Sequence, residues 1–332
     1  MKKIWLLLLS MMFVTLVACN SKDKEEDTAN EKTEDKTEQT DKTKDDAEND
    51  TTENKDVSSK STTAEYDESK QETNMMKMSR PGVEGTIEFV HSDDVLLKQL
   101  QKTEISYELA GVKDEKEAKE QVKELGDEEK YKDQEGVEYK VEYGKDAYTE
   151  TFNVDFTKAD LSLVSSIPEG SEGAERYVSY QSSLDNFKKQ GYYLEGETAT
   201  EVFKLEQEGY LYEVQIEHED NKVLKQTTFN EQTYEALGIK DKKEAEEKFK
   251  ETADHYKELN KEDGVNFNLQ FLDDRFTVDG EMDYEKMKDI KKVIGMMNSG
   301  SEEADSAELV RNYSVMASSL IGSGLEHVET KE

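Results

Sequence analysis

The chain is poor in the residues that usually make disulfides, rigid turns and metal sites. Its 332 residues include one cysteine (Cys19), one tryptophan (Trp5), two prolines and four histidines. A single cysteine excludes an intrachain disulfide, and Cys19 lies far from every histidine in the sequence, which argues against a metal-bound or nucleophilic thiol. The sequence also lacks a phosphate-binding loop, a dinucleotide glycine fingerprint, an HExxH helix, an EF-hand loop and a GxSxG elbow. We therefore expect no enzyme activity and no cofactor.

Basic side chains are scarce relative to acidic ones. The chain has 44 lysines and arginines against 79 aspartates and glutamates, a formal net charge of −35. A surface of this sign repels nucleic acid and anionic lipid headgroups, so we expect no nucleic-acid partner. High solubility outside the cell is the simplest explanation of the acidity.

The first residues have the order of a bacterial export signal. A positive start, Met1-Lys2-Lys3, precedes the apolar run Ile4–Val17, which is shorter than the about 20 residues that a membrane-spanning helix needs. The run ends in Leu16-Val17-Ala18-Cys19, which resembles the lipobox of bacterial lipoproteins, where the cysteine thiol receives diacylglycerol and becomes the new N-terminus. We predict a signal peptide over residues 1–18, lipidation of Cys19, and a position on the outer face of the cytoplasmic membrane.

Residues 19–79 are mostly Lys, Asp, Glu, Thr, Ser, Asn and Gln. Such a segment cannot bury enough apolar surface to offset the entropy of ordering, so we predict a disordered tether. A helix is the alternative, but the many Thr, Asp and Asn residues disfavour it. The folded part is expected to begin near residue 80.

The folded part contains an internal repeat. Residues 91–120 align with residues 218–247 without a gap, and His91, Tyr107 and Gly111 coincide with His218, Tyr234 and Gly238. After one inserted residue the match resumes with 136–139 over 264–267. A duplicated domain explains this pattern, and we predict copies at 80–198 and 199–332.

Each copy shows the same expected order of elements. A hairpin surrounds the turn 91–94, a charged helix over 115–132 begins at the N-cap Asp114, and alternating apolar residues predict strands over 137–143 and 152–156. A helical stretch closes each copy. This order predicts an α+β fold of two tandem two-layer domains, each an antiparallel sheet of hairpins packed on helices.

Four strings carry a resemblance to a known family: 103–107, 111–113, 136–139 and 183–192. Together they resemble the YehR-like bacterial lipoproteins, which carry a domain of unknown function. The resemblance covers residues 82–195 and 209–328. It implies an α+β domain at the cell envelope and brings no catalytic residues.

Three groups of residues are candidate sites. His91 and His218 share one repeat position beside acids and could bind zinc or copper, but we expect both to cap a solvated hairpin turn, and we predict no metal site. Thr198-Ala199-Thr200 resembles a flavin-accepting threonine motif without its preceding Asp and Gly, so we interpret it as a connector. Met75-Met76-Lys77-Met78 could offer soft metal ligands, but a hydrophobic lead-in to the first domain is the favoured interpretation.

These observations favour a non-catalytic binding or accessory module of the cell envelope, anchored to the membrane by its lipid. A solute-capturing receptor lipoprotein for a transporter is the alternative, and its ligand would lie in a cleft between the copies. The partner is expected to be an envelope protein or a small ligand. Asn266, Asn268 and Gln270 form an uncharged strand face, which we predict to contact either the first copy or that partner.

Overall fold

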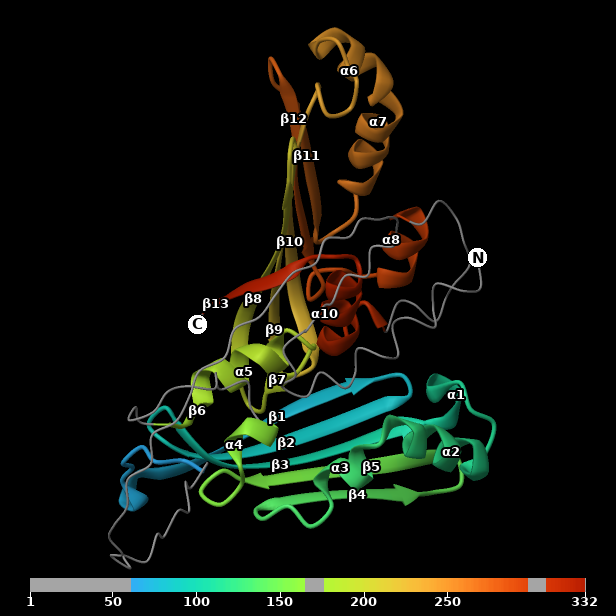
Figure 1. Ribbon diagram of the computed structural model, residues 1–332. Coiled ribbons are helices and arrows are strands. Elements are labelled where there is room, and N and C mark those ends of the chain that lie inside the picture. Colours follow the sequence, from blue (N-terminus) through green and yellow to red (C-terminus); the bar gives the residue numbers. More distant parts are fainter. Residues whose placement is uncertain (1–60, 165–175, 298–308, 332) are drawn as a thin grey trace, which may run out of the picture.

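The computed structural model describes residues 61–164, 176–297 and 309–331. These residues form two antiparallel sheets, one in each repeat (Figure 1). The strand order is β4-β5-β3-β2-β1-β7 in sheet A, where the short β6 also pairs with β3, and β11-β12-β10-β9-β8-β13 in sheet B. The common order confirms the α+β fold with two tandem antiparallel domains.

The first repeat contains these elements: η3 (Glu68–Lys70), β1 (Gln71–Arg80), β2 (Val83–Ser92), β3 (Val95–Ser106), α1 (Tyr107–Ala110), α2 (Glu115–Leu125), α3 (Asp127–Tyr131), β4 (Val137–Tyr143), β5 (Ala147–Asp155), α4 (Leu161–Val164), β6 (Val178–Ser179), α5 (Tyr180–Lys188) and β7 (Tyr193–Leu194). The second repeat contains these: β8 (Thr198–Gln207), β9 (Tyr210–Glu219), β10 (Lys222–Thr233), α6 (Lys242–Lys248), α7 (Lys250–Leu259), β11 (Val265–Phe271), β12 (Arg275–Asp283), α8 (Ile290–Met297), α10 (Tyr313–Gly322) and β13 (Glu326–Lys331).

The predicted signal peptide, Cys19 and the predicted tether up to residue 60 lie outside the described residues. In the part of the chain that the structure describes, no helix has the length and apolar character that crossing a membrane requires.

The prediction that the tether extends to residue 79 is wrong, because β1 begins at Gln71 and pairs with β2 along its whole length. Met76 and Met78 are 0% and 4% exposed, so the methionine run is a core strand rather than a lead-in. The apolar alternation of β1 is weak in the sequence because its inward positions include the polar Asn74.

The long charged helix of the first repeat is interrupted. Asp114 caps α2 as predicted, accepting hydrogen bonds from the backbone N–H groups of Lys116 and Glu117 at 3.0 Å. The helix ends at Gly126, whose φ of 78° is a left-handed conformation that glycine adopts at little cost. The predicted helix 115–132 is therefore two helices, α2 and α3.

Each repeat holds its closing helix through one hairpin turn, β2–β3 in the first repeat and β9–β10 in the second. The carbonyl of Asp94 accepts from the N–H of Tyr180 at 2.8 Å, and the carbonyl of Asn221 accepts from the N–H of Tyr313 at 2.8 Å. The Asp94 and Asn221 side chains each accept from the next backbone N–H, at 2.8 and 2.9 Å. The first backbone N–H groups of a helix have no partner within the helix. At the starts of α5 and α10 they are satisfied by turn residues that hold equivalent positions in the two repeats.

The two repeats are joined by more than a linker. Tyr193 of β7 is 6% exposed and packs in the core of the second repeat, where its ring lies edge-on to Tyr313 with centroids 6.2 Å apart. The carbonyl of Ser79 at the end of β1 accepts from the side-chain amides of Asn221 and Asn312, each at 2.9 Å. The first repeat therefore contributes a side chain to the core of the second, and the second repeat contributes hydrogen-bond donors to the end of β1.

Candidate functional site

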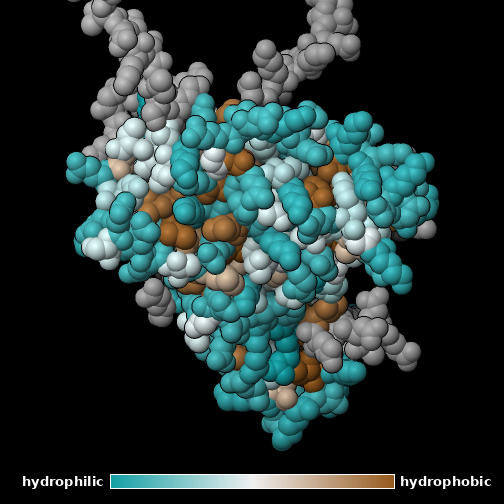
Figure 2. Space-filling view, turned by 90° about the horizontal axis from the view of Figure 1, so that it is seen from below, coloured by the Kyte–Doolittle hydropathy of each residue, from teal (hydrophilic) through white to brown (hydrophobic). Residues whose placement is uncertain are grey.

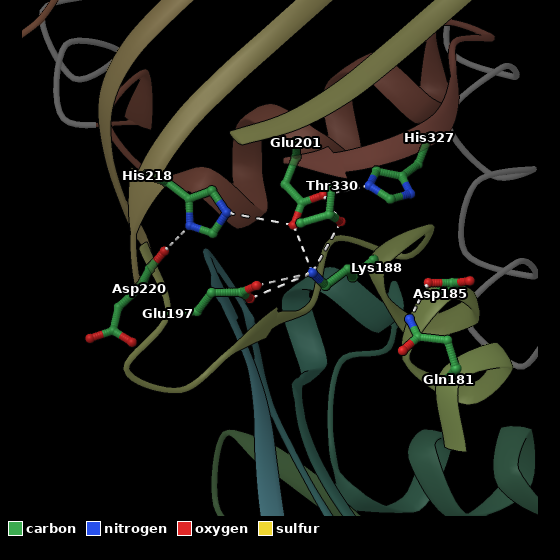
Figure 3. A network of polar contacts seen from close by, with 9 residues as sticks. All are labelled: Gln181, Asp185, Lys188, Glu197, Glu201, His218, Asp220, His327 and Thr330. Atoms are coloured by element: carbon green, nitrogen blue, oxygen red, sulfur yellow. Dashed lines mark hydrogen bonds and ion pairs between the residues drawn. The ribbon is translucent and has the colours of Figure 1, made fainter. Parts of the chain in front are cut away.

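A charged cluster is buried where the repeats meet (Figure 3). Its centre is Glu201 on β8, a side chain with 0% exposure. The Lys188 ammonium lies 3.0 Å from Oε1 of Glu201, and Nε2 of His327 lies 2.5 Å from Oε2. The Thr330 hydroxyl donates to Oε2 at 2.6 Å, and Nε2 of His218 lies 3.9 Å from Oε1. One carboxylate thus faces an ammonium, a hydroxyl and two imidazoles.

Lys188 enters the cluster from the first repeat. It is the last residue of α5, and its side chain is 7% exposed. The same ammonium lies 3.4 Å from the carboxylate of Glu197 and donates to the hydroxyl of Thr330 at 3.1 Å. A lysine so buried requires paired acids, and here those acids come from the connector and from the second repeat.

The cluster favours an ionised Glu201. Burial alone would raise the pKa of its carboxyl, but the imidazoles of His218 and His327, of which His327 is within hydrogen-bonding distance, and the positive charge of Lys188 outweigh burial and hold the pKa well below its usual range. In this group the cation beside the carboxylate is the Lys188 ammonium. Across the described ranges, no set of three or more His, Cys, Asp or Glu side chains is arranged to hold a metal ion.

His218 caps its hairpin turn from a buried position. Its Nδ1 donates to the carbonyl of Asp220 at 2.7 Å, and its ring stacks on Tyr313 with centroids 4.0 Å apart. His91 does the same in the first repeat, donating to Asp93 at 2.8 Å and stacking on Tyr180 at 3.6 Å. Turn capping is confirmed, but the expectation of a solvated position is wrong, because His91 is 5% and His218 is 0% exposed.

The two histidine sites differ in one neighbouring residue, which is Asn74 in the first repeat and Glu201 in the second. In the first repeat Nε2 of His91 lies 2.7 Å from Oδ1 of Asn74, and Asn74 holds the β1 position that Glu201 holds on β8. A neutral amide can be buried with its hydrogen bonds satisfied and needs no counterion, whereas a buried carboxylate does. The second repeat therefore needs Lys188, and the first repeat needs no equivalent cation.

The other sequence candidates are structural. Thr198-Ala199-Thr200 begins β8 and pairs with β9, so its interpretation as a connector is wrong. Asn266, Asn268 and Gln270 are exposed, and the contacts between the repeats described above involve other residues. The predicted contact of this face with the first copy is therefore wrong.

The sequence patterns do not predict this cluster. Lys188, Glu201, His327 and Thr330 are far apart in sequence. The pairing of β13 with β8 brings His327 and Thr330 to Glu201, and α5 of the first repeat brings Lys188. The sequence signal that could have indicated the cluster is the repeat. If its alignment is extended without a gap to β1 and β8, Glu201 takes the position of Asn74.

The fold and the cluster define a tandem α+β repeat protein whose two domains share a buried ion pair. The family described as "Protein of unknown function (DUF1307)" matches residues 72–193 and 199–319, and the chain belongs to that family. These matches confirm two tandem copies and the YehR-like resemblance.

Two relatives are lipoproteins of Listeria. The uncharacterized lipoprotein Lin0239 of Listeria innocua is 33% identical over 103 residues, which are 30% of this chain and 65% of that protein, just under two thirds of its length. The uncharacterized lipoprotein Lmo0207 of Listeria monocytogenes is 29% identical over 125 residues, 37% of this chain and 80% of that protein. The NMR structure of the E. coli YehR protein is 26% identical, covers 38% of this chain and 91% of YehR, and has a TM-score of 0.31. The chain is a lipoprotein of unknown function.

Proposed function

We propose that the chain is a non-catalytic binding or accessory module, held on the outer face of the bacterial cytoplasmic membrane by lipid on Cys19. The Leu16-Val17-Ala18-Cys19 sequence and the lipoprotein names of the Listeria relatives support the anchor. The test is labelling of cells with a radioactive fatty acid. Cys19→Ala should abolish the label, and Ala18→Gly, which keeps a small residue before the cysteine, should retain it. A labelled Cys19→Ala protein would contradict the anchor.

The observation that supports binding most is the open outer face of sheet B. The helices that the structure describes in the second repeat, α6, α7, α8 and α10, lie on one side of this sheet (Figure 1). On the other side is a hollow of about 290 Å³, lined by Glu213, Gln215, Thr227, Thr228, Phe229, Asn266, Asp279, Gly280 and Glu281. Its size is near the lower end of the roughly 300–1,000 Å³ of ligand pockets.

The chemistry of this hollow favours a partner rich in hydrogen-bonding groups. Two of its acids already have partners: Lys225 lies 2.9 Å from Glu281, and the amide of Gln215 donates to Glu213 at 2.7 Å. Asn266 adds an uncharged amide at its edge. An anionic partner is disfavoured by the three acids of the lining.

The matching strand of the first repeat is less suited to contact. Glu138, Lys140 and Glu142 occupy the exposed side of β4, where β11 carries Asn266, Asn268 and Gln270. Charged groups cost more to desolvate than amides. From below, the surface is mostly hydrophilic and its hydrophobic residues lie in separate groups (Figure 2), so this side offers no broad apolar surface either.

The test is crosslinking in membranes followed by mass spectrometry of what co-purifies. Replacing Asn266, Asn268 and Gln270 together by Lys should remove the specific partner or ligand. The matched control combines Glu138→Lys with Glu142→Gln, which changes the net charge by the same amount on the first repeat and should leave capture intact. If the triple variant, with its fold verified by circular dichroism, still captured the same partner, the proposal that this face binds the partner would be wrong.

A solute-capturing receptor is the alternative function, and one observation favours it. An open hollow of about 510 Å³ is lined by Glu219, Asp220, Asn221, Lys222, Arg311 and Asn312. It lies at the junction, because Asn221 and Asn312 also bind the Ser79 carbonyl of the first repeat. Native mass spectrometry of the lipoprotein extracted from cells distinguishes a solute receptor from an accessory module. A receptor should carry a bound small solute, and the Asn221→Ala variant should lack it.

A further inference from the structure

Glu150 is a buried carboxyl that has no cation. It lies on the inner face of β5 and is 5% exposed. The Tyr139 hydroxyl donates to it at 3.3 Å, and within the described residues it forms no ion pair with a lysine, arginine or histidine. A buried acid without a counterion is expensive in its charged form, whereas its protonated form can share hydrogen bonds with a phenol.

The groups that face Glu150 are phenols and another acid. Tyr139 and Tyr143 come from β4 and Tyr148 from β5, and the rings of Tyr143 and Tyr148 have centroids 6.3 Å apart. Asp127, at the start of α3, is the acid whose charge acts on Glu150. The Lys119 ammonium lies over the Tyr143 ring, 5.1 Å from its centroid, rather than beside Glu150.

Helices α2 and α3 cover this part of the sheet. Ala118 and Val122 of α2 pack with Tyr148 in one apolar cluster. Tyr131 of α3 packs on Phe152 with ring centroids 4.8 Å apart. Glu150 lies between these contacts along β5, so its charge state bears directly on how the two helices stay in place.

The second repeat replaces the whole set by apolar side chains. Val141 pairs with Glu150 in β4–β5, and Leu269 pairs with Val278 in β11–β12. By the same register Tyr139, Tyr143 and Tyr148 become Phe267, Phe271 and Phe276. The carboxyl and the three hydroxyls are therefore present together in one repeat and absent together from the other.

We propose that Glu150 and its three tyrosines form a pH-sensitive latch, which holds the α2–α3 cover on sheet A while the carboxyl keeps its proton and loosens the cover when the carboxyl ionises. The second repeat has no such latch, so only the first repeat responds. The carboxylate of Asp127 adds repulsion to the ionised state.

The pKa of Glu150 agrees with this arrangement. Burial raises it to about 8, the hydrogen bond from Tyr139 opposes that rise, and the charge of Asp127 adds to it. A glutamate in the unfolded chain titrates near a pKa of about 4.3. The stabilisation of the closed cover is thus complete below about pH 4.3, is lost progressively up to about pH 8, and then levels off.

The experiment is hydrogen–deuterium exchange of the full chain between pH 5 and pH 9, corrected for the intrinsic rate. We expect the opening constant of α2–α3 amides to rise with pH, by at most about tenfold per unit, and to level off above pH 8. The amides of α6–α7 are the control in the same molecule and should show no such rise. Glu150→Gln should remove the rise in α2–α3.

A second variant keeps the test decisive if Glu150→Gln does not fold. Glu150→Val with Tyr139→Phe, Tyr143→Phe and Tyr148→Phe copies the set that the second repeat already buries. It should make α2–α3 as insensitive to pH as α6–α7. A rise that persists in either folded variant, or an equal rise in α2–α3 and α6–α7 of the native chain, would overturn the latch.

Discussion

The Lys188 ammonium of the first repeat lies 3.0 Å from Oε1 of Glu201 in the second, and their side chains are 7% and 0% exposed. Removing both charges from water costs nearly as much as their attraction returns, so such a pair adds little net stability. Separating the charges is far more costly, because each would be left buried alone. The pair therefore selects one arrangement of the two repeats.

Acid should weaken the chain through Glu201. Its folded pKa is held below the usual value of about 4.3, so the stabilisation from its carboxylate is complete above that value and is lost as the pH falls through the folded pKa. We expect the difference in unfolding free energy between the native chain and Glu201→Gln to be largest at neutral pH and to shrink below about pH 4.3. Urea denaturation at a series of pH values measures it, and a constant difference would contradict this assignment.

Tyr313→Phe should not weaken the protein. The Tyr313 ring is fully buried, but in the described part of the chain its hydroxyl has no hydrogen-bond partner. Deleting a buried, unpaired hydroxyl should leave stability unchanged or raise it by about 1–3 kcal/mol. Tyr313→Ala, which also deletes the ring that stacks on His218, should cost about 3–5 kcal/mol. A Phe variant as unstable as the Ala variant would mean that the hydroxyl is needed.

The second repeat should depend on the end of the first. A chain of residues 199–332 lacks both Lys188, the cation of Glu201, and Tyr193, which packs in the second core. We expect this fragment to melt at a lower temperature than a fragment of residues 180–332, which restores α5 and β7. Calorimetry compares them, and equal melting temperatures would show that the repeats are independent.

Much of the fold could be predicted because the repeat has no gap from the β2–β3 turn through β3 to the following helix. The β4–β5 and β11–β12 hairpins followed from alternating apolar residues, which is a local signal. β1 was missed because its inward face includes Asn74, so only the pairing with β2 reveals it as a core strand. The break at Gly126 was missed because the surrounding residues are good helix formers.

The cluster could not be predicted because its members meet only in three dimensions. Lys188 lies at the end of a helix, Glu201 directly after the segment 198–200 that was interpreted as a connector, and His327 near the C-terminal end. Each residue looks solvated in sequence, and burial depends on the docking of one repeat against the other. His218 lies between Glu217 and Glu219, whose exposed side chains predict a solvated position, but its own ring points to the opposite side of β9 and is buried.

A double-mutant cycle on Lys188 and Glu201 tests most directly whether this pair joins the repeats. Lys188→Met and Glu201→Gln should each cost about 3–5 kcal/mol of unfolding free energy, because each leaves a buried group unpaired. The double variant should cost clearly less than the sum, by more than about 2 kcal/mol. The same substitutions at the more solvent-accessible pair Lys204 and Glu206, whose side chains are 36% and 68% exposed, should cost less than about 1 kcal/mol each and add. Losses at Lys188 and Glu201 that add within about 0.5 kcal/mol would contradict the account.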